Sequence, residues 1–94
     1  MKLYSADKKI NMSSSPQFEV RKNKVYPTMH NPDAINASRA LPWFEIKGDK
    51  MYSTIHSPIG HKVMPIYEIR NDLVHTTVYH PKYVMGAVYK IRKE

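Results

Sequence analysis

The sequence predicts an all-β fold: a ring of four β-hairpin repeats, closed by pairing of the N-terminal and C-terminal strands. The main observation is an internal repeat, since residues 16–32 align without gaps with residues 42–58, and a third copy spans residues 65–81. Within each copy, apolar and polar residues alternate on both sides of a polar pair. The chain also ends on half a repeat. A short repeated unit is typical of stacked or ring-shaped architectures, so the repeat determines the expected fold.

Each copy has the pattern of a β-hairpin, because period-two alternation flanks two residues that suit a tight turn. The first segments are 18–20, 44–46 and 67–69, the turns are 22–23, 48–49 and 71–72, and the second segments are 25–30, 51–56 and 74–79. Asn, Asp and Gly tolerate the positive φ that such turns require. Seven prolines argue against helices, and only residues 33–39 could form a single helical turn.

The fourth hairpin is expected to combine the two ends of the chain. Residues 87–91 match residues 65–69 but lack a following strand, while residues 2–6 match residues 50–54. Pairing the two ends would remove the exposed strand edges that invite aggregation. The expected organisation is one domain, 1–94, with repeat units 16–41, 42–64 and 65–86, and a fourth unit, 87–94, completed by 1–7. An open antiparallel meander and a dimer that exchanges terminal strands are the alternatives.

The repeat Pro-x-Phe-Glu-Ile … Val-Tyr-x-Thr-x-His-x-Pro covers nearly the whole chain. In this respect the chain resembles small pseudo-fourfold hairpin-repeat proteins of the four-fold β-flower type. The resemblance concerns architecture, and it supplies neither a catalytic residue nor a ligand.

A two-residue turn at 48–49 fixes the register, with Ile46 opposite Met51 and Glu45 opposite Tyr52. Cross-strand partners point to the same side of a sheet, so each hairpin has an apolar face and a polar face. The apolar face, expected to be the core, comprises Leu3, Phe18, Val20, Val25, Met29, Phe44, Ile46, Met51, Ile55, Tyr67, Ile69, Val74, Val78, Tyr89 and Ile91.

The opposite face carries recurring hydrogen-bonding side chains, which we consider candidate ligand-binding residues. They are Glu19, Tyr26, Thr28, His30, Glu45, Tyr52, Thr54, His56, Glu68, His75, Thr77 and Tyr79. One interpretation is structural: Glu accepts from Tyr across the strand pair, and Thr or His caps the Pro-containing turn that follows. The other is a site for a small polar ligand or, through His30, His56 and the carboxylates, a divalent metal. The fourth hairpin has Lys90 in place of Glu and Ala6 in place of Thr.

Basic residues are concentrated at the expected hairpin tips of a chain whose formal net charge is +7. They are Lys2, Arg21, Lys22, Lys24, Lys47, Lys50, Arg70, Arg92 and Lys93. A basic rim suits phosphate contacts, which makes non-specific nucleic-acid binding an alternative function. Lys and Arg are also common in exposed turns that have no binding role. In addition, aromatic residues are not interleaved with these tips, as a base-stacking platform would require.

Motifs of catalysis are missing from the sequence, which has no cysteine, no Gly-rich phosphate loop and no HExxH. We therefore expect a non-enzymatic binding module that recognises a protein or a small polar ligand, without a cofactor or a committed metal site. A small metal-dependent hydrolase using His30, His56 and a Glu is the third alternative. The chain begins without the apolar run of a signal peptide and lacks a stretch of roughly 20 apolar residues. We expect a cytoplasmic protein without a membrane partner, and a homo-oligomer is compatible with the sequence.

Overall fold

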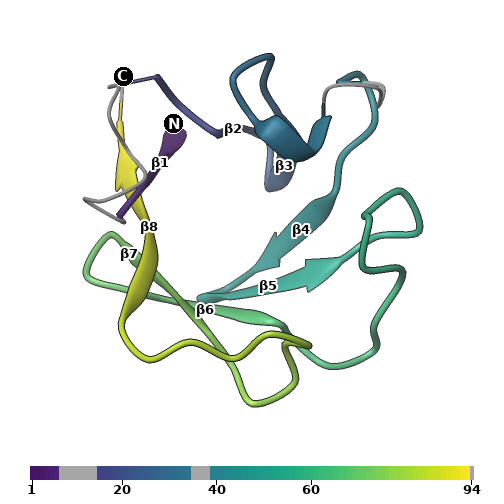
Figure 1. Ribbon diagram of the computed structural model, residues 1–94, viewed down its shortest axis with the longest axis vertical. Helices are drawn as coiled ribbons and strands as arrows, with labels where there is room; N and C mark the ends of the chain where they lie inside the picture. The colour runs from purple at the N-terminus through teal and green to yellow at the C-terminus, as the bar shows by residue number, and fades with distance from the viewer. Residues whose placement is uncertain (7–14, 35–38, 94) are drawn as a thin grey trace.

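The computed structural model describes residues 1–6, 15–34 and 39–93, which form eight short strands (Figure 1). The strands are β1 (Lys2–Ser5), β2 (Phe18–Arg21), β3 (Lys24–Pro27), β4 (Phe44–Lys47), β5 (Lys50–Ser53), β6 (Tyr67–Arg70), β7 (Leu73–Thr76) and β8 (Ala87–Arg92). A single 3-10 turn, η1 (Pro32–Ala34), precedes β4 and falls partly within the segment expected to form a helical turn.

The eight strands form one closed antiparallel barrel in the order of the sequence. β1 pairs with β8 on one side, through Leu3 opposite Ile91, and with β2 on the other, through Leu3 opposite Phe18. Figure 1 shows β1 beside β8 and the two chain ends close together. The predicted ring closure is confirmed, and the open meander is not formed.

The hairpin register is the one that the sequence predicts, with Ile46 opposite Met51 and Glu45 opposite Tyr52. The turns also follow their residue types. Gly48 has φ 64°, and Lys22 and Asn23 have φ 48° and 65°. Positive φ at Lys22 is unfavourable for a residue with a long side chain, whereas Gly and Asn tolerate it. Because connections alternate between the ends of an antiparallel barrel, the hairpin tips and both termini lie at one end. We call this end the tip end, and the opposite one, formed by the connections between hairpins, the loop end.

Four aromatic rings at equivalent positions of the four hairpins meet inside the barrel. Phe18, Phe44, Tyr67 and Tyr89 form a closed cycle, in which successive ring centroids are 5.7, 5.3, 6.0 and 5.3 Å apart. All four contacts are edge-to-face, the favourable geometry for aromatic pairs. We call this cycle the aromatic layer.

A second layer of four equivalent side chains packs against the aromatic layer on the side of the tip end. Leu3, Val25, Met51 and Val74 are each at most 1% exposed. Each lies opposite the ring of the next hairpin in the sheet register, as Val25 does with Phe44. The core therefore repeats four times around the barrel axis, like the hairpins themselves.

Three residues expected in the core are instead exposed at the loop end: Met29, Ile55 and Val78 are 72%, 76% and 79% exposed. The strand alternation ends before them, because Thr28, Thr54 and Thr77 each begin a turn. For example, the Asn31 N–H donates to the Thr28 carbonyl at 3.1 Å. Trp43 and Ile66, which the sequence pattern did not place in the core, are 4% and 0% exposed and fill the space near the loop end.

Candidate functional site

The glutamates of the polar face connect neighbouring hairpins through ion pairs. Glu45 accepts from Lys24 Nζ of the preceding hairpin at 2.6 Å, and Glu68 accepts from Lys50 Nζ at 2.7 Å. The hydrogen bond and charge of Lys24 hold the pKa of Glu45 below its usual value, and Lys50 does the same for Glu68. Glu45 therefore accepts from lysine, where the sequence suggested the cross-strand Tyr52, and Glu68 accepts from lysine in the same way.

Basic residues of the partner strand cover two tyrosines of this face, Tyr26 and Tyr52. Arg21 lies 4.0 Å from the ring centre of Tyr26 and also pairs with Glu19 at 3.1 Å. Lys47 lies 5.3 Å from the ring centre of Tyr52. Cation–π contacts at exposed sites are worth roughly 0.5–1 kcal/mol. The face thus supports a network of outward-facing charges and rings. His75 lies opposite Glu68 in the register of the third hairpin.

The three threonines of this face join the start of each repeat to its end. The hydroxyls of Thr28, Thr54 and Thr77 donate to the carbonyls of Pro16, Pro42 and Pro65 at 2.5, 2.5 and 2.6 Å. Each hydroxyl also accepts a backbone N–H two residues later, from His30, His56 and Tyr79 respectively, at 3.2 Å. This arrangement gives the threonines a structural role of the kind that the sequence indicated.

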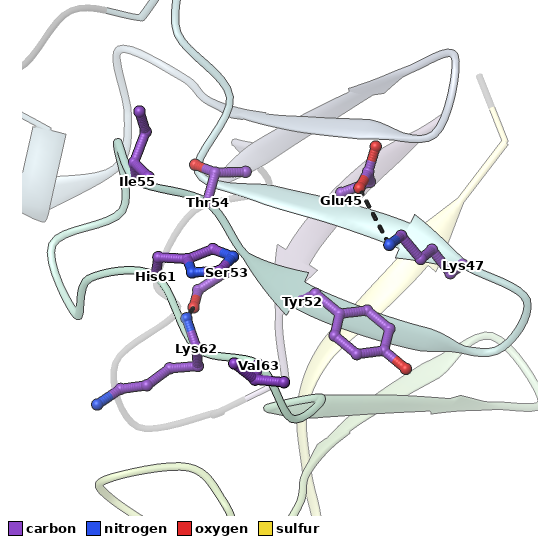
Figure 2. Close-up of a pocket in the computed structure, with 9 residues that line it drawn as sticks. All are labelled: Glu45, Lys47, Tyr52, Ser53, Thr54, Ile55, His61, Lys62 and Val63. Carbon is purple, nitrogen blue, oxygen red and sulfur yellow. Dashed lines mark hydrogen bonds and ion pairs between the residues drawn. The ribbon is translucent and has the colours of Figure 1, made fainter.

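The polar face carries two separate hollows. One, of about 320 Å³, is lined by Glu19, Tyr26, Thr28 and His30 of the first repeat and also by Lys2 of the fourth. Another, of about 450 Å³, includes Glu45, Tyr52 and Thr54 together with His61 and Lys62, which come from the connection to β6. Figure 2 shows Glu45 and Lys47 on one side of this second hollow and His61 on the other. The candidate residues thus meet repeat by repeat, and these two hollows have no lining residue in common.

The nine basic candidates lie on the strands and turns of the tip end, or beside them. Five of them form ion pairs with carboxylates of their own strand or of a neighbouring strand: Arg21, Lys24, Lys47, Lys50 and Arg70. A sixth, Arg92, lies 4.9 Å from the ring centre of Tyr4. Contacts to phosphate would therefore compete with interactions that already occupy these side chains.

Metal ligands do not gather in the part of the chain that the structure describes. Among residues 1–6, 15–34 and 39–93, no group of three or more His, Cys, Asp or Glu side chains could hold a metal ion. His30 and His56, on which the metal alternatives depended, lie in the equivalent turns of two different repeats.

A smaller and more enclosed pocket, which the sequence did not indicate, lies at the loop end over the aromatic layer. We call it the axial pocket. It has a volume of about 190 Å³. Its residues are Phe18, Asp33, Trp43, Phe44, Ser57, Pro58, Ile59, Tyr67, His80, Pro81, Lys82 and Tyr89. They include all four rings of the aromatic layer, so the pocket lies at the mouth of the barrel, a common location for ligands.

The walls of the axial pocket come from equivalent proline turns of the repeats. Asn31, Ser57 and His80 each precede a proline, and the side chain of each accepts the N–H two residues later, at 2.9, 3.4 and 2.9 Å. Histidine thus takes the place that Asn and Ser have in the other two repeats. Because it is longer, its second ring nitrogen extends to the Tyr67 hydroxyl, 3.2 Å away.

Burial changes the acid–base properties of the polar groups in this pocket. It raises the pKa of the Tyr67 and Tyr89 hydroxyls. The negative charge of Asp33 raises the pKa of both hydroxyls further. Burial lowers the pKa of His80, and the nearby charge of Lys82 acts in the same direction. Near neutral pH the pocket therefore presents two protonated phenols and an uncharged imidazole.

Departures from the repeat are the sequence signal that could have identified this pocket. The positions of Tyr67 and Tyr89 are occupied by Phe18 and Phe44 in the other hairpins, and His80 replaces Asn or Ser. These departures become meaningful only when the barrel closes, because closure brings equivalent positions together on one axis.

Comparisons with protein-family models, with curated proteins and with solved structures found no significant match for this chain. In the described residues, no helix is long and apolar enough to cross a membrane.

Proposed function

We propose that this protein is a non-enzymatic binding module that takes a small polar ligand in the axial pocket. The observation that carries the proposal is the composition of this partly enclosed pocket of about 190 Å³, where five aromatic side chains meet the polar groups of Tyr67, Tyr89 and His80. Ligand sites typically combine an apolar, largely preformed wall with a few convergent polar groups. Of the two partner classes expected from the sequence, the pocket supports the small ligand.

The acid–base state of the pocket favours binding over catalysis. Raised pKa values keep the Tyr67 and Tyr89 hydroxyls protonated near neutral pH, so they act as hydrogen-bonding groups rather than as bases. We also propose that the barrel is of the four-fold β-flower type. Its four hairpins and the aromatic layer on their common axis support this assignment.

The test is a screen of the purified protein against a library of single-ring fragments. Trp43, the only tryptophan, lines the pocket and provides a fluorescence signal, and amide chemical shifts in NMR spectra locate the site. We expect fragments that perturb Trp43 and the residues near Ile59. Ile59→Phe adds bulk to the pocket wall and should weaken this binding. Ile55→Phe, at a site that is 76% exposed, is the matched control and should leave it unchanged.

A library in which no fragment perturbs Trp43 would contradict the proposal. Fragments that bind the wild type and both variants equally would contradict it as well, because their site would then lie outside the axial pocket.

Nucleic-acid binding at the tip end is the second candidate, supported by the concentration of nine basic residues there in a chain of net charge +7. It predicts an affinity that falls steeply with salt, since phosphate contacts release counterions. Replacing Lys22 and Lys93 by Ser should weaken binding of a single-stranded oligonucleotide in low salt. Replacing Lys62 and Lys82 at the loop end should not. An oligonucleotide that produces no gel shift at low salt would eliminate this candidate.

A further inference from the structure

The hydrogen bonds on the polar side of the axial pocket have a defined direction. The backbone N–H of Lys82 donates to His80 Nδ1 at 2.9 Å, so Nδ1 must carry a free lone pair. A neutral imidazole then has its proton on Nε2. This nitrogen lies 3.2 Å from the Tyr67 hydroxyl, and it therefore donates to the Tyr67 oxygen.

A second phenol, that of Tyr89, lies beside Tyr67 in the pocket lining. The centre of the Tyr89 ring lies 6.0 Å from that of the Tyr67 ring. Burial raises the pKa of both hydroxyls, which keeps them protonated and able to donate near neutral pH. Because Tyr67 is held by His80, we assign the contact with a ligand to the hydroxyl of Tyr89.

The pocket lining holds one charged group of each sign, Asp33 and Lys82, and the one that acts on the two phenols is the negative charge of Asp33. The Asp33 carboxylate lies close enough to raise the pKa of both tyrosines. Lys82 is the cation of the pocket lining, and its charge acts on His80. A full charge placed among buried phenols also loses its hydration. An uncharged group that accepts from Tyr89 and donates toward Asp33 satisfies these conditions.

The size and the apolar wall of the pocket limit the remainder of the ligand. Phe18, Trp43, Phe44 and Ile59 provide aromatic and aliphatic surface around about 190 Å³. Since an apolar cavity of about 150 Å³ is known to hold benzene, the pocket has room for one ring and a small substituent.

We propose that the axial pocket binds an uncharged single-ring molecule carrying a carboxamide. Its carbonyl accepts the hydroxyl proton of Tyr89, its amide N–H faces Asp33, and its ring lies against the apolar wall. This inference rests on the proposed ligand-binding function and specifies the chemical class of the ligand.

The test compares three probes of similar size: benzamide, benzoate and toluene. Titrations follow Trp43 fluorescence at neutral pH, and NMR confirms the site. We expect benzamide to bind at least about ten times more tightly than benzoate. Tyr89→Phe should lower the affinity for benzamide by about 2- to 13-fold, as expected for the loss of one neutral hydrogen bond, and should leave the affinity for toluene unchanged. Phenylalanine fits this position, since Phe18 and Phe44 occupy its equivalents. Tyr26→Phe on the outer face is the matched control.

Asp33→Asn provides a second measurement that does not depend on Tyr89. Removing this carboxylate should raise the affinity for benzoate and reduce the preference for benzamide. Unfolding in urea checks that each variant is folded at the concentration of the titration.

Two outcomes would overturn the inference while the proposed function stands. In the first, benzoate binds as tightly as benzamide. In the second, Tyr89→Phe lowers the affinities for toluene and benzamide equally. If none of the three probes binds but other fragments of the library do, the ligand class alone is wrong. If no library fragment binds either, the proposed function fails as well.

Discussion

Leu3 provides the most direct test of barrel closure, because it is the third residue of the chain and yet is 1% exposed. It pairs with Ile91 of β8 and with Phe18 of β2, so it belongs to the strand that closes the barrel. Replacing a fully buried leucine by alanine costs about 2–5 kcal/mol, because apolar contacts are lost and a cavity remains. At about 0.05–0.15 kcal/mol per residue, a chain of 94 residues has a free energy of unfolding of about 5–14 kcal/mol. Leu3→Ala should therefore remove a large part of the stability.

The assay is urea denaturation, followed by Trp43 fluorescence and by circular dichroism. If Leu3→Ala is too unstable for a folded baseline, Leu3→Val keeps the measurement possible. Val25 and Val74 occupy equivalent positions, and the loss of one methylene should cost about 0.5–1.5 kcal/mol. Val63→Ala, at a site that is 81% exposed, is the control and should change stability by less than about 0.5 kcal/mol. A Leu3→Ala variant that loses less than about 1 kcal/mol would refute closure by β1.

Three further predictions concern the turns and the axial pocket. Lys22→Asn should stabilise the protein by about 0.5 kcal/mol in thermal melts, because Asn tolerates the φ of 48° at this position, and an unchanged or lower Tm would contradict this. Burial lowers the folded-state pKa of His80, so the unfolded chain takes up the proton first and the free energy of unfolding should fall as pH decreases below about 6.5. This dependence should shrink in His80→Gln but not in His61→Gln, and equal curves for the two variants would exclude His80 as its cause. Tyr67→Phe leaves the His80 Nε2–H without its acceptor and should cost about 1–3 kcal/mol in urea denaturation. Adding His80→Asn removes this unpaired N–H and should recover much of the cost, whereas an unchanged cost would argue against the hydrogen bond between His80 and Tyr67.

The fold was predictable because its local signals agree with one another. The two-residue turn at 48–49 placed Ile46 opposite Met51, and the match between residues 2–6 and 50–54 identified β1 as the closing strand. The prediction failed at Ile55, where alternation was extended past Thr54. A threonine that begins a turn and one that continues a strand have the same side chain, and only the hydrogen bond from its hydroxyl to the Pro42 carbonyl distinguishes them.

The functional prediction was limited for a different reason. It relied on residues that recur from repeat to repeat, and such residues indicate the architecture rather than a ligand site. The recurring glutamates and threonines carry contacts that repeat from hairpin to hairpin, such as the pair of Glu45 with Lys24 and that of Glu68 with Lys50. The axial pocket depends instead on residues that do not recur. Tyr67 and His80 become neighbours because the β6–β7 hairpin and the turn that follows it fold back over the barrel mouth.

The aromatic layer itself argues that these departures have a function. A layer of four phenylalanines would fill the axis without polar atoms, as Phe18 and Phe44 do on their half of it. Burying a hydroxyl without a partner costs roughly 1–3 kcal/mol, so two buried phenols lower the free energy of unfolding of a small domain unless they are paired. The chain offsets part of this cost by supplying His80 as a partner of Tyr67, from a turn where Asn or Ser serves equally well in the other repeats. Replacing both tyrosines by phenylalanine would remove this cost without disturbing the four-fold packing. We therefore expect Tyr67→Phe combined with Tyr89→Phe and His80→Asn to fold with near wild-type stability, while losing the affinity for benzamide.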